Sequence, residues 1–136
     1  MGVLSALLSG RCDRLLATDI VASVVERAGE RCRIFPGVRV EERAIPEAWP
    51  EGPFDLVVLS EIAYYFDAEA LADVMARMVG STLPGATVVA VHWSGETNYP
   101  LSGDAAHRIL AEDPCLEPFV HHLEPEFVLD VWRTHS

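Results

Sequence analysis

Positively charged side chains are scarce in this sequence. The 136 residues include 10 Lys and Arg against 21 Asp and Glu, so the formal net charge is −11. Binding to nucleic acid needs a basic surface that displaces counterions, and polybasic attachment to an anionic membrane needs a similar surface. The charge balance therefore excludes a nucleic-acid partner and a polybasic membrane role.

Long apolar runs and paired cysteines are also lacking. No apolar run approaches the ~18 residues of a membrane span, and no basic segment precedes the short apolar stretch in residues 1–8, as it does in a signal peptide. Cys12, Cys32 and Cys115 form no CxxC pair and no pattern with metal-ligand spacing. We therefore expect a cytoplasmic protein with reduced thiols, no membrane segment and no bound metal.

Half of the residues are apolar, which is typical of one globular domain over residues 1–136. Helical spacing of apolar residues predicts helices over 2–10, over 21–32, from a cap at Asp67 to a point before Pro84, and from a cap at Ser102 or Asp104 to about residue 112. Short apolar runs predict strands at 14–18, 38–41, 54–60, 86–92, 119–123 and 127–132. Alternating strands and helices indicate an α/β domain whose mostly parallel sheet carries helices on both faces.

Ligands of such doubly wound sheets bind at the carboxyl ends of the strands. The residues at these ends are Asp19, Ala44 with Ile45, Ser60 with Glu61, and His92 with Trp93. Asp19 lies where an acid can accept both hydroxyls of a ribose, and Ile20 beside it can cover one face of an adenine. Asp19 can equally cap the helix that follows, and the sequence leaves both interpretations open.

Several segments, in this order along the chain, are similar to one known family. They are 11–20, Trp49-Pro50, 54–61, Tyr64-Tyr65, His92-Trp93, Thr97, 99–101, Gly103-Asp104, His107 and 127–132. Together they resemble class I S-adenosylmethionine-dependent methyltransferases, and the branch similar to nodulation protein S in particular. The resemblance covers nearly the whole chain, and it is the set of segments rather than any single one that makes it specific.

The resemblance implies a Rossmann-like, seven-stranded fold whose last two strands form an antiparallel hairpin. It also implies that S-adenosylmethionine is the cofactor, with Asp19 at the ribose, Ile20 and Ile45 beside the adenine, and Ser60 and Glu61 beneath the methionine portion. The list of implied cofactor contacts is completed by Ala44, where the family usually has an acid that meets the adenine amino group, and by Gly2, which matches the last glycine of the family's Gly-rich loop.

The family's first strand has no counterpart in this sequence. In the family it lies at the centre of the sheet, between the strands that here end at Asp19 and Ser60. Without it, two strands would expose unpaired backbone groups or would have to pair with one another. We therefore expect an N-terminally incomplete domain, which is poorly stable alone or has its true start upstream.

Methyl transfer requires few catalytic side chains, because alignment of the nucleophile with an activated methyl group supplies much of the rate enhancement. A base is needed only where the acceptor arrives protonated, as an amine does. The candidates for this catalytic role are Glu61, His92 and His107, and each has a structural alternative: Glu61 as an acid at a helix start, and the histidines as buried, hydrogen-bonded groups. Tyr65, Trp93 and Tyr99 are the candidates for acceptor binding, although Tyr64 and Tyr65 can also be packing aromatics.

Two functions remain in competition. The first is a methyltransferase that acts on a small molecule, such as the amine of an amino sugar or oligosaccharide. The acidic charge favours a neutral or cationic acceptor. The second is an inactive fragment or degenerate paralogue of the same fold that cannot hold the donor. A dehydrogenase is poorly supported, because the sequence contains no GxGxxG motif.

Overall fold

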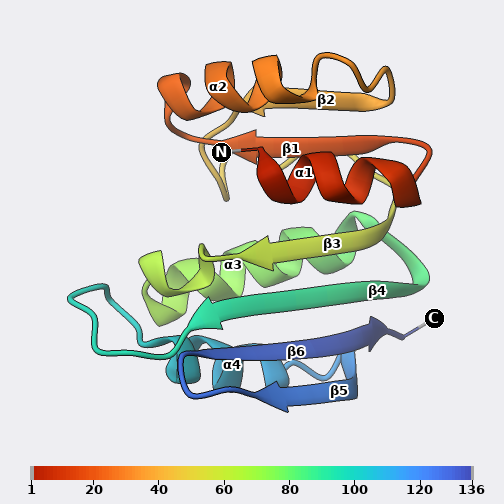
Figure 1. Cartoon of the computed structure of the whole chain (residues 1–136). Helices are drawn as coiled ribbons and strands as arrows, with labels where there is room; N and C mark the ends of the chain where they lie inside the picture. The colour runs from red at the N-terminus through yellow and green to blue at the C-terminus, as the bar shows by residue number, and fades with distance from the viewer. Residues whose placement is uncertain (1, 136) are drawn as a thin grey trace. The chain divides into compact units, whose positions relative to one another are not determined.

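The computed structural model describes residues 2–135, and helices and strands alternate along them as the apolar pattern predicts (Figure 1). The chain divides into two compact units, one that ends at Trp49 (unit 1) and one that begins at Pro50 (unit 2). The longest of the described helices has 13 residues, whereas ~20 residues are needed to cross a bilayer. None of the helices in residues 2–135 can therefore span a membrane.

Unit 1 is a two-stranded parallel sheet with two helices. Its elements are α1 (Val3–Leu8), the 3-10 turn η1 (Ser9–Arg11), β1 (Leu15–Asp19), α2 (Ala22–Cys32) and β2 (Val38–Glu42). Helix α2 packs on both strands and on α1, with Ala28 and Cys32 buried. Gly2 precedes α1 with φ +76°, and a Cβ at this position would come within 2.9 Å of the Ala28 Cα atom. Only glycine combines that backbone conformation with so close an approach to α2.

Unit 2 is a four-stranded mixed sheet with two helices. Its elements are β3 (Phe54–Ser60), the 3-10 turn η2 (Ala63–Tyr65), α3 (Ala68–Gly80), β4 (Thr82–Trp93), α4 (Gly103–Ala111), β5 (Leu116–Leu123) and β6 (Phe127–Thr134). The strand order is β3-β4-β6-β5, with β3 and β4 parallel and the other two pairs antiparallel. The predicted antiparallel hairpin at the end of the chain is therefore confirmed.

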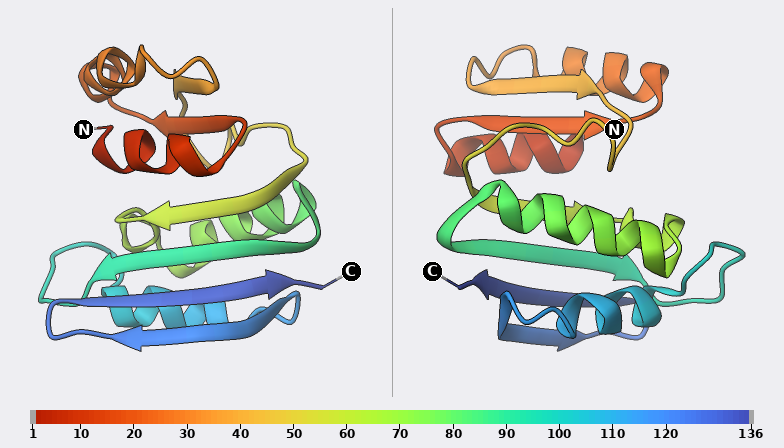
Figure 2. Two further views of the ribbon diagram at one scale, coloured as in Figure 1. Left: turned by 45° about the vertical axis from the view of Figure 1, so that its right-hand side comes forward. Right: turned by 180° about the vertical axis from the view of Figure 1, so that it is seen from behind.

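The core of unit 2 lies between one face of this sheet and the helices α3 and α4, which lie side by side on that face (Figure 2). Side chains alternate along a strand between its two faces. The buried side chains accordingly occur at every second position of β4 and β6: Ala86, Val88, Ala90 and His92, and Val128, Asp130, Trp132 and Thr134. Three of these side chains, His92, Asp130 and Thr134, are polar groups in a mostly apolar core.

The helix caps of unit 2 follow from the sequence. The Asp67 side chain accepts a hydrogen bond from the Ala70 N–H at 2.8 Å, which confirms the predicted cap of α3. Of the two candidates for α4, Ser102 is the cap, because its hydroxyl accepts from the Ala105 N–H at 3.0 Å. Asp104 lies in the first turn instead, where its charge complements the helix dipole.

The structure differs from the sequence-based expectation in several local features, among them the start of β5 at Leu116 instead of residue 119. Strand β4 begins at Thr82 instead of residue 86, because Phe54 of β3 already pairs with Thr82. The 3-10 turn η2 was not expected, since three residues are too few to show a helical period. Within residues 2–135, β1 pairs only with β2, and β3 pairs only with β4.

Candidate functional site

The carboxyl ends of β3 and β4 bring Ser60, Glu61 and Trp93 together in unit 2. The two strands are parallel and in register from Leu56 with Thr87 to Ser60 with Val91, so they end at the same edge of the sheet. The Glu61 carboxylate accepts a hydrogen bond from the Trp93 N–H at 2.8 Å through Oε1. Glu61 thereby links the ends of both strands.

Glu61 also has an unusual backbone. Its φ is +55°, which is the left-handed region that residues other than glycine rarely adopt. Its N–H donates to the Val91 carbonyl at 3.0 Å, which stabilises the turn that follows β3. Such conformations cost about 1–3 kcal/mol and cluster at functional sites. The strained turn directs the Glu61 side chain toward the end of β4.

Tyr64 holds the second oxygen of this carboxylate. Its hydroxyl donates to Glu61 Oε2, and its ring is buried, with 4% of its surface exposed. Burial, followed by the hydrogen bond to Glu61, raises the pKa of Tyr64 above its ordinary value. Tyr64 therefore remains a protonated hydrogen-bond donor at neutral pH.

Tyr64 is also the inner member of an aromatic cluster with Tyr65 and Tyr99. The ring centroids lie 5.2 Å apart for Tyr64 and Tyr65, 4.9 Å for Tyr64 and Tyr99, and 4.4 Å for Tyr65 and Tyr99. The Tyr65 hydroxyl donates to the Tyr99 hydroxyl at 3.3 Å. Tyr65 and Tyr99 are 51% and 40% exposed, so these two rings are available to a bound molecule and Tyr64 is not.

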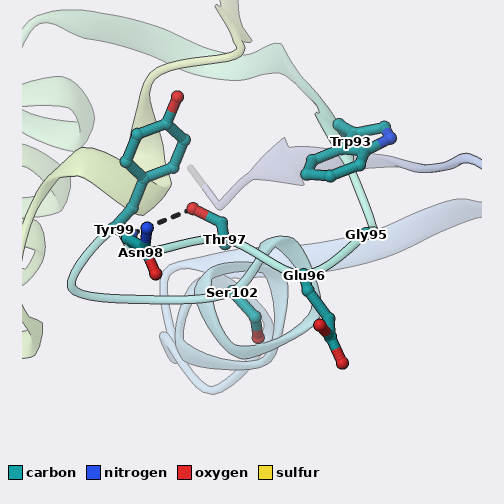
Figure 3. Close-up of a pocket in the computed structure, with 7 residues that line it drawn as sticks. All are labelled: Trp93, Gly95, Glu96, Thr97, Asn98, Tyr99 and Ser102. Atoms are coloured by element: carbon teal, nitrogen blue, oxygen red, sulfur yellow. Dashed lines mark hydrogen bonds between the residues drawn. The ribbon is translucent and has the colours of Figure 1, made fainter.

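The loop that follows β4 forms an open hollow of about 700 Å³ beside this cluster, drawn in Figure 3. It is lined by Trp93, Gly95, Glu96, Thr97, Asn98, Tyr99 and Ser102. In Figure 3 the Trp93 and Tyr99 rings point to one side of the loop and the Glu96 side chain to the other. The Trp93 indole covers Gly95 so closely that a Cβ there would lie 2.0 Å from it. The hollow thus presents two aromatic rings on one side of the loop.

His92 and His107 lie beneath this edge of the sheet, in the core of unit 2. His92 Nδ1 is 2.9 Å from His107 Nε2, and His107 Nδ1 is 2.6 Å from Asp130 Oδ2. The Ile62 and Ala63 N–H groups donate to His92 Nε2 at 3.1 Å and 2.9 Å. Burial, followed by repulsion from His107, lowers the pKa of His92 to about 3, so this ring is neutral at ordinary pH.

The three predicted catalytic candidates are therefore placed differently. Glu61 is exposed, whereas His92 is fully buried and His107 is 4% exposed. Both ring nitrogens of each histidine already have a partner, so neither can take up a proton from an acceptor without losing a hydrogen bond. No group of three or more His, Cys, Asp or Glu side chains in residues 2–135 is arranged to hold a metal ion.

Sequence reasoning missed Asp130, which anchors these histidines. It is 8% exposed and lies on β6. A signal was present, because an acid at a core-facing position of an alternating strand must find partners. The partners themselves come from α4 and from β5, whose His121 binds Asp130 Oδ1 through Nδ1, and spacing alone does not reveal them.

The remaining candidates lie in unit 1, around the carboxyl end of β1. Asp19 Oδ1 accepts from the Val21 N–H at 2.9 Å, so it stabilises the turn before α2, whose N-cap is Val21. The Arg43 N–H donates to the Asp19 carbonyl at 2.9 Å, which holds the segment with Ala44 and Ile45 beside Asp19. Ile20 is 65% exposed. This arrangement combines a carboxylate with exposed apolar surface.

Several solved structures are similar to this chain. A candidate methyltransferase from Pseudomonas syringae is 37% identical, with a TM-score of 0.86 over 97% of this chain and 80% of that one. The N-methyltransferase NodS from Bradyrhizobium japonicum WM9, in complex with S-adenosyl-L-homocysteine, is 20% identical, with a TM-score of 0.86 over 99% of this chain and 74% of that one.

A third structure, the DhpI complex with S-adenosylhomocysteine, is 17% identical, with a TM-score of 0.80 over 99% of this chain and 72% of that one. No family model matches the chain, and no curated protein sequence matches it at a significant level. The similarity to NodS and DhpI extends to the fold, whereas the similarity to the Pseudomonas protein extends to the sequence over most of both chains.

Proposed function

Because this chain belongs to the family of class I S-adenosylmethionine-dependent methyltransferases, we propose that it methylates the amine of a small molecule, such as an amino sugar or oligosaccharide. One observation carries the choice of acceptor. The Glu61 carboxylate lies at the ends of β3 and β4, next to the buried ring of Tyr64. The exposed rings of Tyr65 and Tyr99 pack against that ring.

This combination of groups suits an amine borne on a sugar. A protonated amine is attracted both to a carboxylate and to the faces of aromatic rings, and the net charge of −11 favours a cation over an anion. Tyr65, Trp93 and Tyr99 offer flat apolar surface on which a sugar ring can pack. NodS, which shares the fold, is itself described as an N-methyltransferase.

The residues around Asp19 fit the donor. One Asp19 oxygen accepts the Val21 N–H, and the other has no partner within residues 2–135, so it can accept ribose hydroxyls. Exposed Ile20 and half-buried Ile45 supply apolar surface for the adenine. The Ala44 side chain has no hydrogen-bond acceptor for the adenine amino group, so we assign it a packing contact at most.

The remaining donor contacts are proposed from the resemblance. Gly2 leaves room for close backbone approach, and the Ser60 hydroxyl and Glu61 lie beneath the methionine portion. S-adenosylmethionine supplies a methyl group that is already activated on a positively charged sulfonium. The side chains of this protein then have two tasks, which are to align the acceptor nitrogen with that methyl group and to take the proton that leaves the amine.

We assign the proton to Glu61. Each of its oxygens accepts one hydrogen bond, from Trp93 N–H and from Tyr64 O–H, and each retains a lone pair toward solvent. The carboxylate can therefore bind the ammonium first and accept its proton as the nitrogen becomes nucleophilic. His92 and His107 have no such lone pair, because all four of their ring nitrogens are hydrogen-bonded.

The test uses the full chain and two measurements. Titration calorimetry with S-adenosylhomocysteine measures donor binding. Methyl transfer is then followed with glucosamine and chitosan oligomers, which carry a free amine, and with glucose and chitin oligomers, which do not. Micromolar donor binding with methylation of the amines alone is the expected result.

Two outcomes contradict the proposal at different points. Absence of donor binding overturns methyl transfer by this chain. Donor binding without methylation of the amines, or with equal methylation of the sugars that lack them, overturns the choice of acceptor. Glu61→Gln should abolish most of the transfer, whereas Glu117→Gln, the same change at an exposed position of β5, should leave it intact.

A further inference from the structure

We infer that His92, His107 and Asp130 form a proton-ordered hydrogen-bond chain that positions the η2 turn for acceptor binding. The inference rests on the proposed function in one respect, namely that Tyr65 of this turn contacts the acceptor. The histidines are then positioning residues and not the base. Their effect passes through the backbone of Ile62 and Ala63.

The backbone of η2 begins with N–H groups that need hydrogen-bond partners. The first N–H groups of a helical turn have no partner within the turn, and buried N–H groups are almost always paired. Here the Ile62 and Ala63 N–H groups both donate to His92 Nε2. The His92 side chain, which comes from β4, therefore accepts the N–H groups that a capping residue usually accepts.

The hydrogen bonds of the two histidines determine which ring nitrogen carries the proton. A neutral imidazole has one N–H donor and one acceptor nitrogen. Because His92 Nε2 accepts, its proton lies on Nδ1 and is donated to His107 Nε2. His107 then carries its own proton on Nδ1 and donates it to Asp130 Oδ2. With both rings neutral, this arrangement satisfies every contact, and a shift of either proton breaks at least one.

Asp130 is the anchor of this chain of hydrogen bonds. Asp130 lies on β6, where it pairs with Ala90 of β4 on one side and with His121 of β5 on the other. Its second oxygen accepts from the His121 side chain, which is 62% exposed. The anchor is thus a side chain on an inner strand of the sheet whose two oxygens both accept hydrogen bonds. It determines which way the two buried rings donate.

The η2 turn is continuous with the residues that we propose for acceptor binding. Glu61 precedes the two N–H groups that His92 accepts, and Tyr64 and Tyr65 follow them directly. The Leu101 N–H donates to the Tyr64 carbonyl at 3.2 Å, so the loop with Tyr99 is attached to the same turn. A displacement of η2 would therefore move the carboxylate and both exposed tyrosine rings together.

A pair of variants at one position separates the contacts of His92. Glutamine places its side-chain oxygen near the former position of His92 Nε2, so it can still accept the N–H groups of η2. The asparagine side chain ends near the former position of His92 Nδ1, so it reaches only His107. His92→Gln should therefore keep kcat for glucosamine within about threefold, and His92→Asn should lower it about 10-fold to 100-fold, as misplacement of reacting groups does. Binding of S-adenosylhomocysteine should be unchanged in His92→Gln, because this variant keeps η2 and Glu61 in place.

Nuclear magnetic resonance of the unmodified chain tests the proton order without any activity. Long-range proton–nitrogen correlations should show His92 and His107 both in the Nδ1–H form, and hydrogen exchange should be slow at Ile62 and Ala63 and faster in His92→Asn. An Nε2–H form of His92, or equal losses of kcat in the two variants, would overturn the inference. If the chain binds no donor, the proposed function fails, while the proton order is still decided by these spectra.

Discussion

Replacing Asp130 with alanine should lower the free energy of unfolding by about 1–3 kcal/mol, the cost of a buried polar group that loses its partner. The His107 Nδ1–H donates to Asp130 Oδ2 at 2.6 Å, and the His107 side chain is only 5% exposed. Water cannot readily replace the lost acceptor there. The second contact contributes little to this figure, because the His121 side chain is 62% exposed and water can take over its hydrogen bond.

Two further variants make this magnitude specific. Asp130→Asn keeps an oxygen acceptor for His107 and should cost less than about 1 kcal/mol, while His121→Ala removes only the exposed contact and should cost less than about 0.5 kcal/mol. Urea unfolding of the three variants, followed by tryptophan fluorescence and circular dichroism, measures the differences. The reasoning is refuted if Asp130→Asn is as destabilising as Asp130→Ala, or if His121→Ala matches either.

Three other predictions concern the site. Glu61→Gln should lower kcat/KM for glucosamine about 100-fold or more, which is the range for loss of a general base. The control variant Glu117→Gln should leave kcat/KM unchanged. Equal effects of the two variants would show that Glu61 is not the base. Asp19→Ala should weaken binding of S-adenosylhomocysteine about 10-fold to 100-fold in calorimetry, the cost of lost hydrogen bonds to a carboxylate, and exposed Asp13→Ala should not. Because the pKa of His92 falls from 6.5 to about 3 on folding, the unfolded chain takes up the extra proton as the pH drops. Stability should therefore fall by about 2 kcal/mol between pH 7.5 and pH 5, and urea midpoints for His92→Gln should lack this component.

The local structure was predictable because it depends on neighbouring residues. Apolar spacing identifies the helices, Asp67 identifies where α3 begins, and Ser102 was one of two candidates for the start of α4. The boundary of β4 was less predictable. Its first residues have no apolar pattern, and they extend the strand only because β3 lies beside them.

The candidate site was predictable in part, for the same reason. Parallel strands end at one edge of a sheet, so Glu61 and Trp93 were expected near one another, and the structure joins them through a hydrogen bond. The placement of Tyr99 at 4.4 Å from Tyr65 was outside the reach of such reasoning, because it depends on the path of the loop after β4.

The sequence alone determined the α/β class, the element order, the strand ends that carry polar groups and the resemblance to methyltransferases, since each depends on short-range pattern. Only the tertiary structure decided that Glu61 faces outward while His92 and His107 turn into the core and meet Asp130. The physical reason is that residues 15 and 23 positions apart in sequence are brought within hydrogen-bonding distance by the insertion of β6 next to β4 and the packing of α4 on both. A histidine at a strand end becomes a base or a buried support according to which neighbours the fold places around it.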